Sequence, residues 1–516
     1  MEKIFETSCP CELFFREEDL KKFLSSSSCG IKPQNLHYKV LRKSIDARKR
    51  PVFRLKVAVS DCPFEAKPIK REYKDVSNAE RVIVVGAGPC GLFAALKLIE
   101  KGLKPIIIER GKPVSERKKD IAIIARNYDL NEESNWCFGE GGAGTFSDGK
   151  LFTRSTKKGN ITEVLETFVY HGADENILVE THAHIGTDRL SRVIKNIRKT
   201  ILDYGGEYHF NTKVIDFLVN KDNRVYGVKT SLQTEIEAKA VILATGHSAR
   251  DIYQLFATKG WAIEAKPFAM GVRVEHSQEL INASQYNDKT IAHLLPAASY
   301  SLVHNVNNRG VFSFCMCPGG MIIPASTEKG SLVVNGMSSS NRGSKFANSG
   351  IVVSINLQDV KEYKDFPALS LMKFQQECEK KMYVNNQTAP AQRISDFIKN
   401  KASSNIGASS YPSGLHACNM NDFLPKIVAE NLKEGFKVFD RRIKGFISNQ
   451  ATMIGLESRT SSPVRILRDK ESLQHPQLSM LFPCGEGAGY AGGITSSAID
   501  GVNVAEKIAQ LFELDK

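Results

Sequence analysis

Three glycines at a fixed spacing, Gly86, Gly88 and Gly91, stand directly after the apolar run at 82–85. This pattern is typical of a parallel strand that turns into a helix around the pyrophosphate of a dinucleotide. The first glycine permits a tight turn, the second lets the backbone approach the phosphates, and the third lets the helix pack against the strand. The helix would direct its N-terminal N–H groups and its dipole at the diphosphate.

A carboxylate completes the pattern at the end of the next strand. Residues 104–109 read Lys-Pro-Ile-Ile-Ile-Glu, and Glu109 stands eighteen positions after Gly91. At this point of the motif a carboxylate accepts hydrogen bonds from ribose hydroxyls. A glycine triplet alone is weak support, because a βαβ unit can contain a glycine-rich turn without a ligand. Strand, turn, helix, strand and acid together predict a dinucleotide site.

Two further glycine-rich segments expose backbone N–H groups. The glycines of residues 138–150 disfavour a regular helix or strand and let the backbone approach a ligand closely. Polar side chains add contacts in the same loop: Thr145, Ser147 and Asp148. Near the C-terminus, residues 480–489 predict a strand ending in a glycine turn, and glycines at 492–493 precede a second helix. That helix N-terminus indicates a second polar contact with the same ligand.

Length and composition are those of a globular chain with several domains. It has 516 residues, 42% hydrophobic and 25% charged, and the length alone suggests about three domains. No apolar run of about 18 residues predicts a membrane span, and the N-terminus lacks a secretory signal pattern. The 11 cysteines, an odd number, indicate reduced thiols in a cytoplasmic protein. The two C-x-C pairs, Cys9/Cys11 and Cys315/Cys317, lack zinc-site spacing, so we expect no metal.

The formal net charge is +13, and basic residues gather at 42–43, 48–50, 70–71 and 117–119. A basic surface attracts anionic partners such as dinucleotides, nucleic acid or acidic lipids. Aromatic residues do not alternate with the basic ones in the manner of a single-strand-binding surface. We therefore favour a solvated surface for these clusters over a dedicated nucleic-acid site.

The order of patterns divides the chain into four segments. Residues 1–77 predict a small α+β domain with a helix at 17–24 and strands at 36–41 and 52–59. The dinucleotide-binding domain would comprise residues 78–249 and 446–516, with residues 250–445 between them as a substrate or cap domain. The other predicted elements are helices at 92–98, 119–126 and 188–204 and strands at 208–214, 225–230, 234–238 and 240–246.

Longer motifs resemble one family. The fingerprint, an Ala-Thr-Gly strand end at 244–246 and a Gly-Glu turn at 485–486 are similar in order to the FAD-binding domain of the glutathione-reductase superfamily. Residues 43–49, 139–151, 314–320 and 457–465 resemble the uncharacterised FAD-dependent dehydrogenases with a small N-terminal domain. The resemblance implies an α/β fold, in which a Rossmann-like FAD-binding domain carries an inserted α+β substrate domain and a small N-terminal α+β domain.

The resemblance also implies FAD as the cofactor and contacts for its adenosine half. By it, the fingerprint glycines hold the pyrophosphate and Glu109 holds the adenosine ribose. Val214 meets the adenine through its backbone, and Thr245 and Gly246 line the adenosine side. The full set of cofactor-binding residues that we predict is Gly86, Gly88, Pro89, Cys90, Gly91, Glu109, Arg110, Gly142, Gly144, Thr145, Ser147, Asp148, Val214, Thr245, Gly246, Gly485, Glu486, Gly492, Gly493 and Ile494.

The same resemblance implies contacts for the flavin half. Gly485 and Glu486 contact the ribityl chain and the diphosphate, although the superfamily usually has aspartate where Glu486 stands. The helix that opens at Gly493 and Ile494 points its dipole at the flavin N1 and O2 atoms. A partial positive charge there stabilises the anionic reduced flavin and raises its reduction potential.

Several other side chains are candidates for chemistry, and each has a simpler interpretation. Cys315 and Cys317 could be redox-active thiols facing the flavin, or small inert core residues, which we favour because C-x-C is a strained spacing for a disulfide. His182, His184 and His247 are candidate proton donors or structural histidines. Arg459 and Arg465 either bind an acidic substrate or form surface salt bridges. None of these is assigned as a catalytic residue.

The sequence therefore predicts an FAD-dependent oxidoreductase that transfers a hydride between a small-molecule substrate and flavin N5. Only one glycine fingerprint is present, which argues against a second dinucleotide-binding domain and leaves open NADH or NADPH as an electron donor that binds transiently, without a Rossmann domain of its own. The alternative is a flavoprotein that binds RNA or a protein partner through its basic N-terminal domain. A flavin-binding protein without turnover is a third hypothesis.

Overall fold

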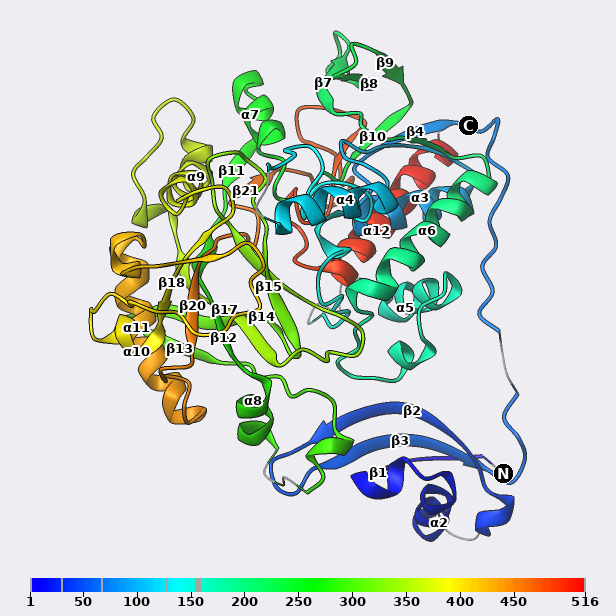
Figure 1. The fold of residues 1–516 in the computed structure, drawn as a ribbon. Coiled ribbons are helices and arrows are strands. Elements are labelled where there is room, and N and C mark those ends of the chain that lie inside the picture. Colours follow the sequence, from blue (N-terminus) through cyan, green and yellow to red (C-terminus); the bar gives the residue numbers. More distant parts are fainter. Residues whose placement is uncertain are drawn as a thin grey trace.

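The computed structural model describes residues 2–28, 31–65, 68–126, 129–153, 159–286, 288 and 290–514. Figure 1 shows three regions. The N-terminal sheet lies at the bottom, the helices α3, α12 and α6 at the right, and a large sheet with helix α11 at the left. Within the described residues, no helix combines the length and apolar character that a membrane crossing requires.

The N-terminal region is a three-stranded antiparallel sheet covered by helices. Its strands lie in the order β1 (Lys3–Pro10), β3 (Val52–Ser60) and β2 (His37–Asp46), with α1 (Cys11–Phe14) and α2 (Glu17–Ser28) packed against them. The predicted helix and the two predicted strands are confirmed, whereas β1 was not predicted. A small apolar core joins the helices to the sheet: Leu20, Leu24, Leu55 and Val57 belong to it.

The central element is a five-stranded parallel sheet, as a Rossmann-like domain requires. Its order is β22 (Leu481–Pro483), β10 (Ala240–Leu243), β4 (Arg81–Val85), β5 (Lys104–Ile108) and β6 (Glu207–His209). Apolar residues alternate between two buried faces, which explains the near-continuous β-branched runs. Val82 and Val84 pack on the helical side, and Ile83 and Val85 pack on the opposite side.

Helices from both ends of the chain cover the first face of this sheet. They are α3 (Pro89–Lys101), α6 (Thr187–Asp203) and α12 (Ile494–Leu514), with α4 (Val114–Ala125) and α5 (Ile161–Tyr170) nearby. α3 and α12 pack tightly, because a Cβ on Gly501 would lie 2.2 Å from the carbonyl oxygen of Cys90. The second face carries the antiparallel meander β7 (Val214–Val219), β8 (Val225–Thr230) and β9 (Glu235–Glu237).

The predicted continuous strand at 208–214 is wrong. β6 ends at His209 in the parallel sheet, and β7 begins at Val214 in the meander, so the intervening residues carry the chain from one sheet to the other. Asn211 has a left-handed φ of 52° in this crossing. An apolar-polar alternation cannot distinguish one long strand from two short strands of different sheets.

The region after α7 (Arg250–Lys259) is built on a seven-stranded sheet. Its order is β13 (Val303–Val306), β14 (Arg309–Cys317), β17 (Phe346–Ile355), β12 (Phe268–Ser277), β20 (Thr452–Glu457), β18 (Ala389–Arg393) and β19 (Leu415–Ala417). One face packs on α11 (Lys426–Arg442), where Val272 and Val274 meet Leu432 and Phe436. Because side chains alternate along a strand, Arg273 points from the opposite face of β12.

Sheet membership extends past the boundary that we predicted at 445/446. β20 lies beyond it, yet it pairs with β12 and β18. The remaining strands form two pairs, β11 (Ile263–Ala265) with β21 (Val464–Ile466) and β15 (Gly320–Pro324) with β16 (Val334–Ser338). The remaining α-helices within the described residues are α8 (Gln278–Gln285), α9 (Ser370–Lys381) and α10 (Ile394–Ile398).

Candidate functional site

A cavity of about 860 Å³ lies where strands β4, β5 and β10 end and helices α3 and α12 begin. Carboxyl ends of parallel strands meet at one edge of a sheet, which is where doubly wound folds bind ligands. The volume is in the range of small-molecule and cofactor sites. Its far wall comes from β14 and the segment at 299–301 of the seven-stranded region, so two regions of the chain enclose one space.

Most of the residues that we predicted for the cofactor line this cavity. They are Gly86, Gly88, Pro89, Cys90, Glu109, Arg110, Gly142, Gly144, Ser147, Asp148, Val214, Thr245, Gly246, Glu486, Gly492, Gly493 and Ile494. Gly91, Thr145 and Gly485 do not line it. Thr145 is buried and donates its hydroxyl to the carbonyl of Glu140, and the Gly485 N–H donates to Asp500. These three residues therefore lie next to residues that line the cavity, without lining it themselves.

The fingerprint turn needs its glycines for different reasons. Gly86 has a φ of 105°, in the left-handed region, and a Cβ there would lie 2.5 Å from the carbonyl oxygen of Ala244. A Cβ on Gly91 would lie 1.9 Å from the carbonyl oxygen of Gly86. On Gly88 a Cβ would meet only the Cα of Gly142, at 3.9 Å, among the residues that the structure describes. Gly88 therefore leaves open the space that a pyrophosphate would enter.

Glu109 fastens three segments of backbone around the cavity. Its Oε2 accepts the Ala87 N–H at 2.9 Å, and its Oε1 accepts the N–H groups of Gly111 at 3.0 Å and Gly139 at 2.9 Å. The carboxylate is buried yet lines the cavity. It therefore fixes the fingerprint turn against the glycine-rich loop, a role that the sequence did not indicate. The predicted ribose contact stays a prediction.

Arg117 corrects the prediction that the cluster at 117–119 is a solvated basic surface. Its side chain is 0% exposed. The guanidinium donates to five backbone carbonyls, those of Asn135, Trp136, Gly139, Glu140 and Gly142. Burial lowers the pKa of Arg117 to about 10, so the group is charged at neutral pH. It organises the glycine-rich loop through contacts that no local pattern reveals.

Helix α12 presents its N-terminus to the cavity. A Cβ on Gly492 or Gly493 would have no neighbour within 4 Å among the described residues, so the backbone is open there. Thr495 anchors the turn by donating to the Leu151 carbonyl at 2.7 Å. Asp500, on the same helix, accepts the Gly485 N–H at 2.7 Å and pairs with Arg468. Sequence reasoning missed this carboxylate, because its partners are set only by packing.

Two titratable side chains of the cavity lining lie close together. His247 Nε2 lies 3.8 Å from Glu486 Oε1, and both residues line the space. Burial raises the pKa of Glu486 to about 7. Burial, together with Arg459 and Arg250, lowers the pKa of His247 to about 3, so this imidazole is neutral at pH 7. Glu486 is therefore the group here whose charge changes near neutrality.

The other two candidate histidines differ in position. His182 lines the cavity beside Phe152, with ring centroids 4.9 Å apart. His184 does not line it and lies 3.1 Å from the Ser340 carbonyl through Nε2. Burial lowers the pKa of both side chains. Neutral imidazoles at these positions do not supply a charged proton donor at pH 7.

Arg459 is held inside the protein, although it touches the cavity wall. It forms a bidentate pair with Glu379, with Nε–Oε1 at 2.8 Å and Nη2–Oε2 at 3.0 Å. Arg250 also donates to Glu379, at 2.8 Å. Burial alone would raise the pKa of Glu379, but Arg250 and Arg459 hold it at about 2. Arg465 lies outside the cavity and pairs with Glu264 at 2.7 Å.

The end of the cavity formed by the seven-stranded region mixes hydroxyl, amide, thiol and aromatic groups. Its lining residues there are Gln285, Ser299, Tyr300, Ser301, Ser313, Phe314, Cys315, Met316, Asn335 and Arg342. Arg342 holds the buried carboxylate of Asp148 at 2.6 and 3.0 Å, and Lys150 lies 3.3 Å from the same carboxylate. Hydroxyl and amide groups at this end can orient a polar substrate by hydrogen bonds.

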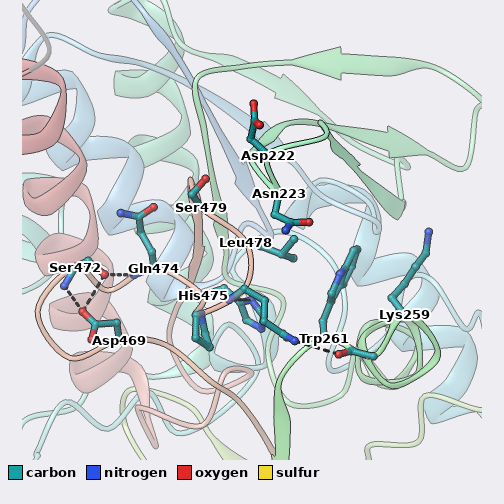
Figure 2. Close-up of a pocket in the computed structure, with 13 residues that line it drawn as sticks. Asp222, Asn223, Lys259, Trp261, Asp469, Ser472, Gln474, His475, Leu478 and Ser479 are labelled. Atoms are coloured by element: carbon teal, nitrogen blue, oxygen red, sulfur yellow. Dashed lines mark hydrogen bonds between the residues drawn. The ribbon is translucent and has the colours of Figure 1, made fainter.

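A second hollow, of about 660 Å³, lies beside Trp261 and the loop at 469–479 (Figure 2). Two of its polar side chains are engaged in local structure. Gln477 accepts the Ala262 N–H, and Asp469 accepts N–H and hydroxyl groups of Ser472. None of the predicted cofactor residues lines this hollow. The cavity at the fingerprint is therefore the candidate site.

Comparison with known families agrees with the order of the regions. Residues 80–289 match the family described as pyridine nucleotide-disulphide oxidoreductase, and residues 267–460 match the one described as FAD-dependent protein, C-terminal domain-like. Residues 1–60 match a domain of unknown function. The first two matches together cover the cavity from the fingerprint to Arg459.

One curated relative resembles nearly the whole chain. An uncharacterized protein of Clostridium beijerinckii is 41% identical over 502 residues, covering 92% of this chain and 93% of that protein. The thiamine thiazole synthase of Pyrococcus horikoshii is 27% identical over 207 residues, covering 37% of this chain and 68% of that enzyme. Among solved structures, CtdE in complex with FAD aligns over 85% of this chain and 86% of its own, at 13% identity and a TM-score of 0.34.

Proposed function

The chain belongs to the family of FAD-dependent oxidoreductases, and from that premise we propose that it transfers a hydride between a substrate and FAD bound in the fingerprint cavity. The observation that carries the proposal is the open backbone cradle. A Cβ on Gly88 would have only the Gly142 Cα within 4 Å, and Gly246, Gly492 and Gly493 have no such neighbour among the described residues. When bound, FAD would supply hydride transfer at N5.

The chain's own residues divide the cavity between cofactor and substrate. Val214, Glu109 and the fingerprint turn would hold the adenosine and diphosphate, where the α3 N-terminus offers backbone N–H groups. The N-terminus of α12 would meet the flavin ring. The substrate would lie against β14, between Phe314 and Tyr300, because these residues form the opposite wall. Their aromatic surfaces would exclude water from the reacting atoms.

The electron donor that we propose is NADH or NADPH, bound transiently. The chain carries one glycine fingerprint, which the proposed FAD uses. A nicotinamide would then reach the flavin only through the cavity end that the substrate also uses, so reduction and substrate turnover would alternate. None of the candidate histidines is assigned as a proton donor, because the pKa of each is lowered.

The test is an anaerobic reduction of the purified protein followed by its visible spectrum. We expect a bound flavin band that NADH or NADPH bleaches. A flavin band that neither nicotinamide bleaches would overturn the proposed donor and leave direct oxidation of a substrate, or binding without turnover. A protein that folds without a flavin band, and does not take up added FAD, would overturn the proposed cofactor.

The alternative function, RNA or protein binding through the N-terminal domain, receives no specific support from the described side chains. Lys43 pairs with Glu180 at 3.1 Å, and Arg48 pairs with Asp46 at 2.6 Å. The Lys43 backbone also pairs with Val179 and Thr181, which docks this domain on the FAD-binding region. It stays a prediction. Its test is whether removal of residues 1–77 abolishes nucleic-acid retention while FAD remains bound.

A further inference from the structure

Cys315 reaches the cavity through an irregularity in β14. Between Phe314 and Cys317 this strand advances three residues while its partner β17 advances two, from Gly350 to Asn348, which is a β-bulge. Cys315 has a left-handed φ of 44°, a conformation that non-glycine residues adopt rarely. The bulge places Cys315 on the cavity wall while Cys317 is buried behind it.

Two cations face this C-x-C turn from different parts of the chain. The Arg273 guanidinium, 0% exposed, donates to the Cys315 carbonyl and lies 3.5 Å from Cys317 Sγ. The Lys150 ammonium donates to the carbonyl of Met316, between the two cysteines. Two carboxylates are the nearest counter-charges, with Glu457 2.8 Å from Arg273 and Asp148 3.3 Å from Lys150. Each cation is therefore shared between a carboxylate and the turn, and both cations lower the pKa of Cys315.

The two thiols of the turn are not equivalent. Cys317 donates to the Cys315 carbonyl at 3.3 Å, so its hydrogen is directed toward its neighbour. The neighbouring Cys317 thiol, together with Lys150 and Arg273, lowers the pKa of Cys315 well below its usual value. The pKa of Cys317 is raised well above its usual value. Of the two thiols, Cys315, which faces the cavity, is therefore the one that loses its proton more readily.

The second C-x-C pair of the chain provides a contrast with the same spacing. Cys9 and Cys11 are buried in the apolar core of the N-terminal domain. Burial raises the pKa of Cys9 to about 11 and also raises that of Cys11. Spacing alone therefore does not lower the pKa of a thiol, whereas the surroundings of residues 315–317 lower that of Cys315.

We propose that Cys315 is a nucleophilic thiolate that reacts with small disulfides entering the cavity, and that Cys317 resolves the product. The Cys315 thiolate attacks one sulfur of the disulfide, the disulfide bond breaks, and the leaving thiolate takes a proton. The Cys317 thiol then loses its proton and attacks the Cys315 sulfur, which releases the second thiol. One protein disulfide forms, at the C-x-C spacing that makes it strained, and two electrons and two protons pass to the substrate. No step needs the cofactor, so the inference is independent of the proposed function.

The second thiol, Cys317, favours disulfides over carbon electrophiles as the substrates of Cys315. A carbon electrophile would leave a thioether on Cys315 that Cys317 could not reverse. A disulfide leaves a mixed disulfide, which an adjacent thiol resolves. The cavity end around Cys315 carries hydroxyl and amide groups, from Ser313 and Asn335, that suit a small polar disulfide.

The first measurement is the rate at which iodoacetamide labels each cysteine of the full-length native protein at pH 6, mapped by peptide mass spectrometry. We expect Cys315 to be labelled at least tenfold faster than Cys62, which is exposed, and than Cys9 or Cys11. Lys150→Met should slow the labelling of Cys315, and Lys150→Arg should restore much of it. Labelling of Cys315 no faster than that of Cys9 would overturn the proposal.

The second measurement uses 2-hydroxyethyl disulfide, a neutral probe. In the wild type, the mass of the peptide that contains Cys315 and Cys317 should fall by two hydrogens, because a disulfide forms. In Cys317→Ser the reaction should end with a mixed disulfide between the probe and Cys315. Cys315→Ser should form no adduct at Cys317 in the same time. If Cys317→Ser and the wild type both stop at the mixed disulfide, the resolving role is wrong. If neither the wild type nor Cys317→Ser forms an adduct at Cys315, the assignment of Cys315 as the nucleophile is wrong. The Lys150 variants, which keep both cysteines, show whether misfolding explains such a result.

Discussion

A methyl group on Gly91 would lie 1.9 Å from the carbonyl oxygen of Gly86, inside the same turn. The same group on Gly88 would lie 3.9 Å from the Cα of Gly142, its nearest neighbour among the described residues other than those adjoining it in the chain. Two glycines of one motif therefore have separate physical roles. Gly91 permits the contact between helix α3 and the turn, and Gly88 leaves room that the protein itself does not fill. Two substitutions can separate these roles.

Gly91→Ala should destabilise the protein itself, by about 1–3 kcal/mol, because the turn must shift to relieve the overlap. The measurement is the midpoint of denaturant unfolding in cofactor-free protein. Gly407→Ala is the control, since a Cβ there meets no described atom within 4 Å. An unchanged midpoint for Gly91→Ala would contradict the tight packing at this position.

Gly88→Val should leave the fold intact and remove the cofactor. The side chain would occupy the space that we assign to the pyrophosphate, while the protein leaves that space open. The visible spectrum and the circular dichroism of the purified variant are compared with those of Gly407→Val. A folded Gly88→Val protein with its full flavin band would refute our interpretation of the fingerprint.

The affinity for FAD should fall as the pH rises through about 7, because burial raises the pKa of Glu486 to about that value. Below pH 7 the carboxyl is neutral, and above it a carboxylate repels the diphosphate. We expect the Kd to rise on the order of tenfold between pH 6 and 8. His247, with a pKa of about 3, keeps its charge state in this range. Lys266, which lowers the pKa of Glu486, and Cys315, which raises it, also face the Glu486 carboxyl.

Glu486→Gln should make the affinity for FAD nearly independent of pH over the same range. Fluorescence titration of flavin into cofactor-free protein measures both constants. A wild-type Kd that stays constant from pH 6 to 8, or a Glu486→Gln variant with the same slope as the wild type, would show that another group controls binding.

Glu379→Ala should cost about 3–5 kcal/mol of folding free energy, because it leaves the buried guanidinium groups of Arg250 and Arg459 without their shared carboxylate. Glu264→Ala removes the partner of Arg465 on the surface and should cost less than about 1 kcal/mol. Denaturant unfolding of the two variants gives the comparison. Equal costs would mean that the buried cluster does not act as a unit.

The sequence by itself determined the local parts of the site. The β-branched run at 82–85, the glycine spacing and the helix that follows depend on contacts within about 25 residues, and the structure confirms β4, α3 and β5. The second glycine turn and helix α12 follow from similar local rules. Because parallel strands present their carboxyl ends at one edge, even the meeting of these segments could be predicted.

Only the tertiary structure decided which charges are buried and what they hold. The sequence predicted that Arg117 lies on the surface, whereas in the structure it is buried among the carbonyls of the glycine-rich loop. The environment of Cys315 depends on Lys150 and Arg273, which come from two other segments of the chain. Burial and electrostatic potential are set by all the neighbours of a group in space, so no local pattern of residues contains them.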